Sequence, residues 1–206
     1  MPSFFARFIA DTRFYHRLRH PQEPAAGALA LLGTALRSRG LWILTFHRIT
    51  YFSTNNRNLR SLVWWLARLV EVPTYYLNCV ANKSEVLGDC NIRGPAYLSD
   101  RGYVICGALS IGAGSVIHDH VTFGNAVAKG RSGRPHIGED VWIGPNCIVA
   151  GPLEIGAGST LLPGTYLTYS VPPRSVVRGN PGRIVREGFD NSALRASTAV
   201  VDALPK

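Results

Sequence analysis

The sequence has little of what marks several common protein classes. Cysteine is scarce and no two cysteines form a CxxC pair, which argues against a zinc site or a dense disulfide framework. We therefore expect reduced thiols in a cytoplasmic protein. The four cysteines are Cys79, Cys90, Cys106 and Cys147. Acidic residues are also few: 13 stand against 22 lysines and arginines, giving a net charge of +9. That excess suits an anionic partner such as nucleic acid, acidic lipid or a phosphorylated cofactor, although a soluble basic surface explains it equally well.

Segments for export or membrane insertion are missing as well. The first 20 residues are charged early and lack the pattern of a signal peptide. The apolar run Gly27–Leu36 is too short to cross a bilayer. The longer run 62–80 is interrupted by Arg68, Glu71 and Pro73. The sequence thus disfavours a spanning helix and leaves peripheral membrane contact open. Dispersed basic residues without a recognition motif argue against nucleic-acid binding.

The chain divides into two parts with different patterns. Residues 1–83 hold most of the bulky aromatic residues and no short repeat. Residues 60–70 have the spacing of an amphipathic helix, Asp11 could cap a helix that runs to Leu18, and Pro24 could open another at Ala25. We therefore predict a small helical bundle, in which Trp42, Trp64 and Trp65 are core or interface residues.

From about residue 86 the chain repeats every six residues. Ten of eleven hexads begin with a bulky apolar residue, and glycine often follows. The hexads are Ser99-DRGYV, Ile105-CGALS, Ile111-GAGSV, Ile117-HDHVT, Phe123-GNAVA, Ile137-GEDVW, Ile143-GPNCI, Val149-AGPLE, Ile155-GAGST, Leu161-LPGTY and Leu167-TYSVP. Internal repetition of this kind outweighs local propensity, and an ordinary sheet would alternate with period two instead.

The period predicts the architecture. Six residues make one short strand and a turn, so three hexads close a triangular coil of about 18 residues, and successive coils pair as parallel strands. The first residue of each hexad should point inward and stack on its equivalents. We predict an α+β protein with a helical N-terminal domain (1–83), a left-handed parallel β-helix (84–187) and a C-terminal tail (188–206).

These hexads resemble the hexapeptide acyltransferases, most closely the serine acetyltransferase branch. The residues that carry the resemblance are the hexads from Ile105 onward, the segment Val121-TFGN, the Gly/Lys/Arg-rich insertion Ala128-KGRSGRP, His136-IGEDVWIG and the closing Val171-PPRSVVRGNPGRIV. The resemblance implies an acyl-CoA co-substrate, with acetyl-CoA first among them, and a homotrimer or dimer of trimers. It also implies that cofactor-binding groups lie at Gly124, Asn125, Ala126, Ala150 and Gly151, and that Arg178, Arg183 and Arg186 could meet the phosphates.

The sequence departs from the serine acetyltransferase pattern at the positions of the catalytic residues. Counting hexads back from Phe123 without gaps, the family's catalytic histidine falls on Ser99 and its preceding aspartate on Leu98. A second family histidine falls on Arg134.

Another base is therefore needed to take the proton of a hydroxyl or amine acceptor. His118 and His120 lie in one hexad, and a coil of 18 residues would place His118 directly beside Asp100. We predict a displaced Asp100–His118 pair, with His120 as rival or helper. His136 cannot be placed, because the insertion breaks the count.

Three functions remain open. The first is acyl transfer to a small-molecule acceptor such as an amino acid, a sugar or a biosynthetic intermediate. The second is a pseudoenzyme or scaffold that kept the β-helix and lost the base. The third is a metal-dependent hydratase of the carbonic anhydrase type, which needs three histidines at a trimer interface and suits the close spacing of His118 and His120 poorly. We predict acyl transfer, with no metal.

Overall fold

The computed structural model describes most of the 206 residues. These are residues 4–23, 26–55, 69, 72–73, 75–77, 79–80, 82–128 and 131–196. Nearly all of the amphipathic segment 60–70, with Trp64 and Trp65, lies outside them. In this part of the chain, no helix is long and apolar enough to cross a membrane.

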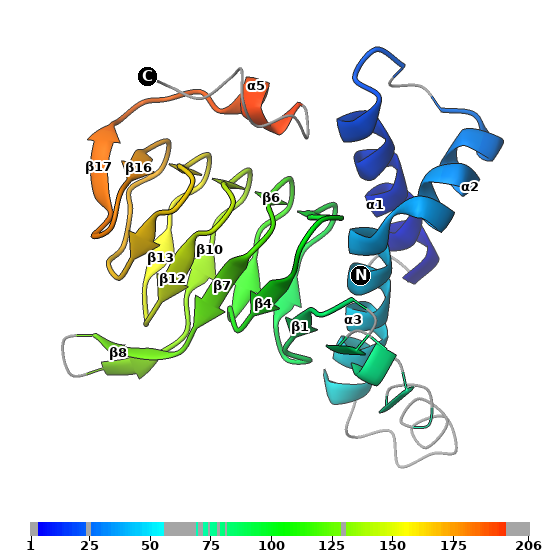
Figure 1. The fold of residues 1–206 in the computed structure, drawn as a ribbon, viewed down its shortest axis with the longest axis horizontal. Coiled ribbons are helices and arrows are strands. Elements are labelled where there is room, and N and C mark those ends of the chain that lie inside the picture. The colour runs from blue at the N-terminus through cyan, green and yellow to red at the C-terminus, as the bar shows by residue number, and fades with distance from the viewer. Residues whose placement is uncertain are drawn as a thin grey trace.

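Three helices come first and lie side by side at one end of the molecule (Figure 1). They are α1 (Phe4–Arg19), α2 (Ala28–Arg37) and α3 (Arg39–Asn55). The prediction that Asp11 caps a helix is wrong, because α1 has already begun at Phe4 and Asp11 lies buried in its middle. The second helix begins at Ala28 rather than at Ala25, which is outside the described residues.

Among the described residues that follow, 72–73, 75–77 and 79–80 are still helical. From β1 onward the chain coils into a parallel β-helix, so the predicted order of helices followed by a β-helix is confirmed. Sheet A holds β1 (Glu85–Val86), β4 (Val104–Cys106), β7 (Val121–Gly124), β12 (Ile148–Ala150) and β15 (Tyr166–Leu167). Sheet B holds β2 (Asn91–Ile92), β5 (Ser110–Ile111), β10 (His136–Ile137) and β13 (Glu154–Ile155). Sheet C holds β3 (Tyr97–Leu98), β6 (Val116–Ile117), β11 (Trp142–Ile143), β14 (Thr160–Leu161), β16 (Val176–Arg178) and the antiparallel β17 (Arg183–Arg186).

Two further elements leave the coils. The insertion forms an antiparallel hairpin of β8 (Ala126–Ala128) and β9 (Arg131–Gly133), which projects from the β-helix between sheets A and B (Figure 1). The short helix α5 (Ser192–Arg195) follows β17 and lies back along the β-helix, where Arg195 pairs with Asp140 at 2.6 Å.

The predicted inward ladder forms, with one exception. Nine of the ten hexad-leading apolar residues are buried and stack between coils. Burying each of these side chains stabilises the fold by about 1.5–3 kcal/mol. Ile105 is the exception: it is exposed on sheet A, and Cys106 points inward in its place. The cause is an uneven coil. Leu98 pairs with Ile117, 19 residues later, whereas Cys106 pairs with Phe123, 17 residues later.

The helices close the first coil of the β-helix. The Tyr15 hydroxyl donates to the Leu98 carbonyl at 2.7 Å and accepts from the Leu98 N–H at 2.8 Å. A buried ion pair joins Arg48 to Asp11, with both guanidinium contacts under 3 Å, and Arg48 also donates to the carbonyl of Ile92. These contacts hold the helices against the first coil, at Ile92 on β2 and Leu98 on β3.

Candidate active site

In every coil, a turn connects sheet C to sheet A. We call the stack of these turns the CA corner; it comprises residues 99–103, 118–120, 144–147 and 162–165. One residue of each turn has a positive φ, the left-handed conformation that glycine adopts most easily. These residues are Gly102 (66°), His120 (58°), Asn146 (59°) and Gly164 (73°).

His120 is the unusual member of this column. Glycine and asparagine occupy such positions at lower cost than histidine, because the left-handed region crowds Cβ. A residue held in a sparsely populated conformation is a pointer to function, and His120 is the one histidine in this column.

The His120 ring is held in a defined orientation. Its Nδ1 lies 3.0 Å from Oδ2 of Asp119, and the ring of Tyr103 meets it edge to face, with centroids 4.8 Å apart. The side chain is 40% exposed, and Nε2 makes no hydrogen bond within the described residues. An imidazole with one nitrogen on a carboxylate and the other open to solvent is the arrangement of a general base and the carboxylate that orients it.

Gly102 makes room for this pair. A Cβ at Gly102 would lie 2.8 Å from Cβ of Asp119 and 2.8–2.9 Å from the His120 ring. Asp119, Tyr103 and Gly102 were all missed by sequence reasoning. The signal that could have found them is the column of left-handed positions, in which glycine and asparagine align with one histidine.

The predicted Asp100–His118 pair is wrong. The 19-residue register places Ser99, rather than Asp100, opposite His118. Asp100 instead binds to the helices: its carboxylate accepts hydrogen bonds from the Arg19 guanidinium at 2.6 Å and from the N–H of Gly40 at 2.9 Å. Ser99 is buried and its hydroxyl accepts from the N–H of Arg101.

His118 is buried beside the aromatic side chains of sheet C. Its ring lies 4.9 Å from that of Trp142 and 6.5 Å from that of Tyr97, and its Nε2 has no hydrogen-bond partner in the described structure. Burial lowers the pKa of His118 from 6.5 to about 4. A neutral, enclosed imidazole cannot reach an acceptor, so His118 is poorly placed to act as a base.

The burial of His118 makes stability depend on pH. The unfolded chain takes up a proton near pH 6.5 and the folded chain only near pH 4, so this stabilisation is complete above pH 6.5 and is lost as the pH falls towards 4. We expect a loss of about 3 kcal/mol in the free energy of unfolding across that window. Urea unfolding between pH 7.5 and pH 4 measures it, and His118→Phe should remove the part of the slope that His118 contributes, leaving that of His47, whose pKa burial also lowers to about 4. A slope in that variant as steep as that of the parent would show that His118 does not contribute.

The cofactor-binding residues predicted from the family resemblance separate into two groups. Gly124 ends β7 and pairs with Ala150, the N–H of Gly151 donates to the Gly124 carbonyl at 3.1 Å, and Asn125 and Ala126 follow at the base of the hairpin. We call this place, where sheet A turns to sheet B, the AB corner. Arg178 on β16 and Arg183 on β17 lie opposite each other in the antiparallel pair of strands, and both side chains are exposed at the last coil of sheet C.

One chain does not bring the AB corner and the CA corner together. His120 precedes β7 and Gly124 ends it, so the two lie at opposite ends of one strand, about 13 Å apart at 3.3 Å per residue. A group bound at Gly124 is therefore out of hydrogen-bonding reach of His120 in the same chain.

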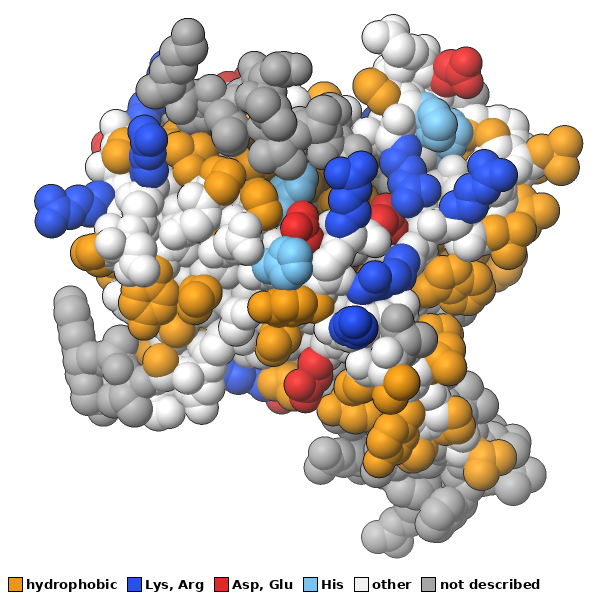
Figure 2. Space-filling view, in the orientation of Figure 1, with side chains coloured by type: hydrophobic (Ala, Val, Ile, Leu, Met, Phe, Trp, Pro, Cys, Tyr) orange, Lys and Arg blue, Asp and Glu red, His pale blue; other side chains and the backbone are white. Residues whose placement is uncertain are grey.

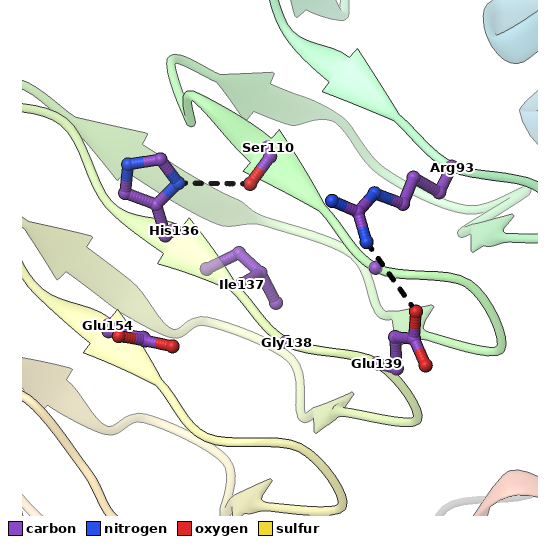
Figure 3. Close-up of a pocket in the computed structure, with 8 residues that line it drawn as sticks. Arg93, Ser110, His136, Ile137, Gly138, Glu139 and Glu154 are labelled. Atoms are coloured by element: carbon purple, nitrogen blue, oxygen red, sulfur yellow. Dashed lines mark hydrogen bonds and ion pairs between the residues drawn. The ribbon is translucent and has the colours of Figure 1, made fainter.

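His136 lies on the outer surface of sheet B. It pairs with Ser110 and Glu154 in neighbouring coils, and its Nδ1 lies 3.0 Å from the Ser110 hydroxyl (Figure 3). These residues, with Arg93 and Glu139, line an open hollow of about 360 Å³. The hollow belongs to a different face of the coil from His120. Figure 2 shows the histidine, acidic and arginine side chains that gather where the helices meet the β-helix.

Comparisons with known proteins agree with this architecture. Residues 134–168 match the family "Bacterial transferase hexapeptide (six repeats)". A 95-residue stretch is 35% identical to serine acetyltransferase 2 of Arabidopsis thaliana; it covers 45% of this chain but only 29% of that relative. Apo serine acetyltransferase of soybean superposes with a TM-score of 0.70 at 23% identity, over 90% of this chain and 70% of that one.

A serine acetyltransferase solved in complex with CoA has the same fold, with a TM-score of 0.64 at 17% identity, over 86% of this chain and 70% of that one. The hexads, the stacked coils and these matches together lead to one conclusion. Residues 134–168 carry the hexapeptide-repeat transferase pattern, and the chain is similar to serine acetyltransferases in sequence over 95 residues and in fold.

Proposed function

We propose that this protein transfers an acyl group, acetyl in the first instance, from acyl-CoA to a hydroxyl or amine of a small acceptor. The observation that carries the proposal is the Asp119–His120 pair: a strained, partly exposed histidine with a carboxylate on Nδ1 and an open Nε2. We assign the base to His120, because His118 is enclosed and Asp100 is engaged by the helices.

The reaction needs one proton relay and no covalent enzyme intermediate. Nε2 of His120 takes the proton of the acceptor as its oxygen or nitrogen attacks the thioester carbonyl. Asp119 stabilises the imidazolium that forms. The carbon–sulfur bond then breaks, and the CoA sulfur takes up the proton that His120 held and leaves as the free thiol. A main-chain N–H near Gly124 or Asn125 would donate to the oxyanion between these steps.

The AB corner suits the pantetheine arm of acyl-CoA. Its residues are small, so the main chain is accessible: among the described residues, a Cβ at Gly124 would have only Cβ of Ala150, at 3.9 Å, within contact distance. Arg178 and Arg183 are exposed cations that could pair with phosphate oxygens. The serine acetyltransferase solved with CoA supports this co-substrate.

The separation of the two corners leads us to propose a trimer. Outward positions of sheet A align Ile105, Thr122, Ile148 and Tyr166 in one ladder, and Ile105, Ile148 and Tyr166 are exposed. Three copies that bury this ladder around a common axis would bring the AB corner of one chain to the CA corner of the next. The oxyanion donors and His120 would then come from different chains.

This assembly makes a direct prediction. Ile148→Arg places a charge in the middle of the ladder and should convert the trimer to monomers, with acyl transfer reduced at least about 100-fold because each site loses half of its groups. Size-exclusion chromatography with light scattering measures the mass, and thiol release measures the activity. Val185→Arg, at an exposed apolar position on β17, is the matched control and should change neither. A monomeric parent with full activity would refute the shared site.

The function itself is tested by thiol release from acetyl-CoA against a panel of amino acids, amino sugars and hydroxy acids. Turnover with one acceptor class supports the proposal and identifies the acceptor. Binding of CoA without thiol release on any acceptor would contradict it and favour a scaffold that kept the β-helix.

A further inference from the structure

Helix α2 has its apolar face turned outward. Leu29, Leu32 and Leu36, spaced by three and four residues, are 84%, 54% and 66% exposed. The opposite face buries Thr34, whose hydroxyl shares a hydrogen bond of 3.0 Å with Nδ1 of His16 on α1. An amphipathic helix of a globular domain normally packs its apolar face against the core. An exposed stripe of leucines therefore indicates a surface that binds a partner or a membrane.

The exposed charged side chains of α1 and α2 are arginines, and one exposed acidic residue, Glu23, lies in the loop between the two helices. Arg13 and Arg17 on α1 and Arg37 at the end of α2 are exposed. Between residues 4 and 55, the described acidic residues are Asp11, which is buried on Arg48, and Glu23. Figure 2 shows exposed hydrophobic side chains next to arginines over the helices.

The arginines favour an anionic lipid surface over a second copy of the chain as the partner of this stripe. A second copy joined by a twofold axis would meet the same patch on itself, so arginines would face arginines and repel. An anionic lipid surface satisfies both parts of the patch, because leucines enter the interface while arginines meet headgroup phosphates. Helix α2 also lies on the side of the helices turned away from the β-helix, where a flat surface can approach it (Figure 1).

We propose that α2, with Arg13, Arg17 and Arg37, docks the protein reversibly on anionic membranes. The leucines supply the apolar contact and the arginines supply charge attraction, without any segment that crosses the bilayer. This inference does not depend on the acyl-transfer proposal, because the patch contains none of the residues assigned to that reaction.

Vesicle co-sedimentation of the full chain tests it. We expect binding to vesicles of equimolar phosphatidylcholine and phosphatidylglycerol, weakened by added salt, and at least about tenfold weaker binding to phosphatidylcholine alone. Arg13→Gln/Arg17→Gln should lower affinity about 25-fold, since each arginine near an anionic surface contributes about fivefold. Leu32→Gln/Leu36→Gln should lower it about tenfold or more.

Two controls make the test specific. Val185→Gln, at an exposed apolar position on β17, should bind as the parent does. Because all substituted side chains are exposed, circular dichroism should show the parent spectrum for every variant. Equal binding to both vesicle types, or no binding to either, would overturn the proposal. Concentration-dependent self-association that the leucine variant abolishes would assign the stripe to a second copy instead.

Discussion

Replacing His120 with asparagine is expected to lower kcat for acyl transfer by about 10²–10⁴-fold, the usual contribution of a general base, while the melting temperature stays the same or rises. Stability is retained because the position has φ of 58°, and asparagine already occupies the equivalent turn at Asn146. Asparagine adopts this conformation more easily than histidine does. Most substitutions at a catalytic position leave it open whether activity or folding was lost; this one separates the two.

A second variant tests the chemical role of the imidazole. His120→Gly also suits the left-handed turn and leaves a space beside Asp119, so added imidazole should restore part of the lost thiol release. His118→Phe is the control, because that side chain is buried and should be dispensable for turnover. If His120→Asn kept full activity, or if His118→Phe lost it at unchanged melting temperature, His120 would not be the base.

Replacing Asp11 with alanine is expected to lower the free energy of unfolding by about 3–5 kcal/mol. The change leaves the buried Arg48 guanidinium without its carboxylate, and it removes the acceptor of the Ala96 N–H as well. In a chain of this length the melting temperature should fall by about 10 °C. Thermal and urea unfolding measure the loss.

A double variant shows whether the charges or the packing matter. Asp11→Leu/Arg48→Met replaces both charges with apolar side chains and should recover most of the loss, because desolvating two ions offsets much of their attraction. The structure already shows that balance: burial raises the pKa of Asp11 although Arg48 acts to lower it. If the double variant were as unstable as Asp11→Ala, the pair would be needed for its hydrogen bonds to the β-helix, at Ile92 and Ala96.

The sequence alone determined the architecture and part of the site. Apolar residues at every sixth position can be buried only by coiling and stacking, so the inward ladder of Ile117, Ile143 and Leu161 follows from the period. The break in that period marked the hairpin. Gly124 and Ala150, both named from the family resemblance, do lie side by side in successive coils.

Only the tertiary structure decided which polar groups meet across the coils. Periodicity is local, whereas register depends on the length of each turn, and the long turn after Leu98 moved Asp100 away from His118 and onto Arg19. The same is true of the helices. Composition shows that α2 is rich in leucine, but only its packing against α1 shows that Thr34 is buried and the leucines face outward. Partners across sequence distance are chosen by the competing contacts of the whole fold, and those contacts are absent from any local pattern.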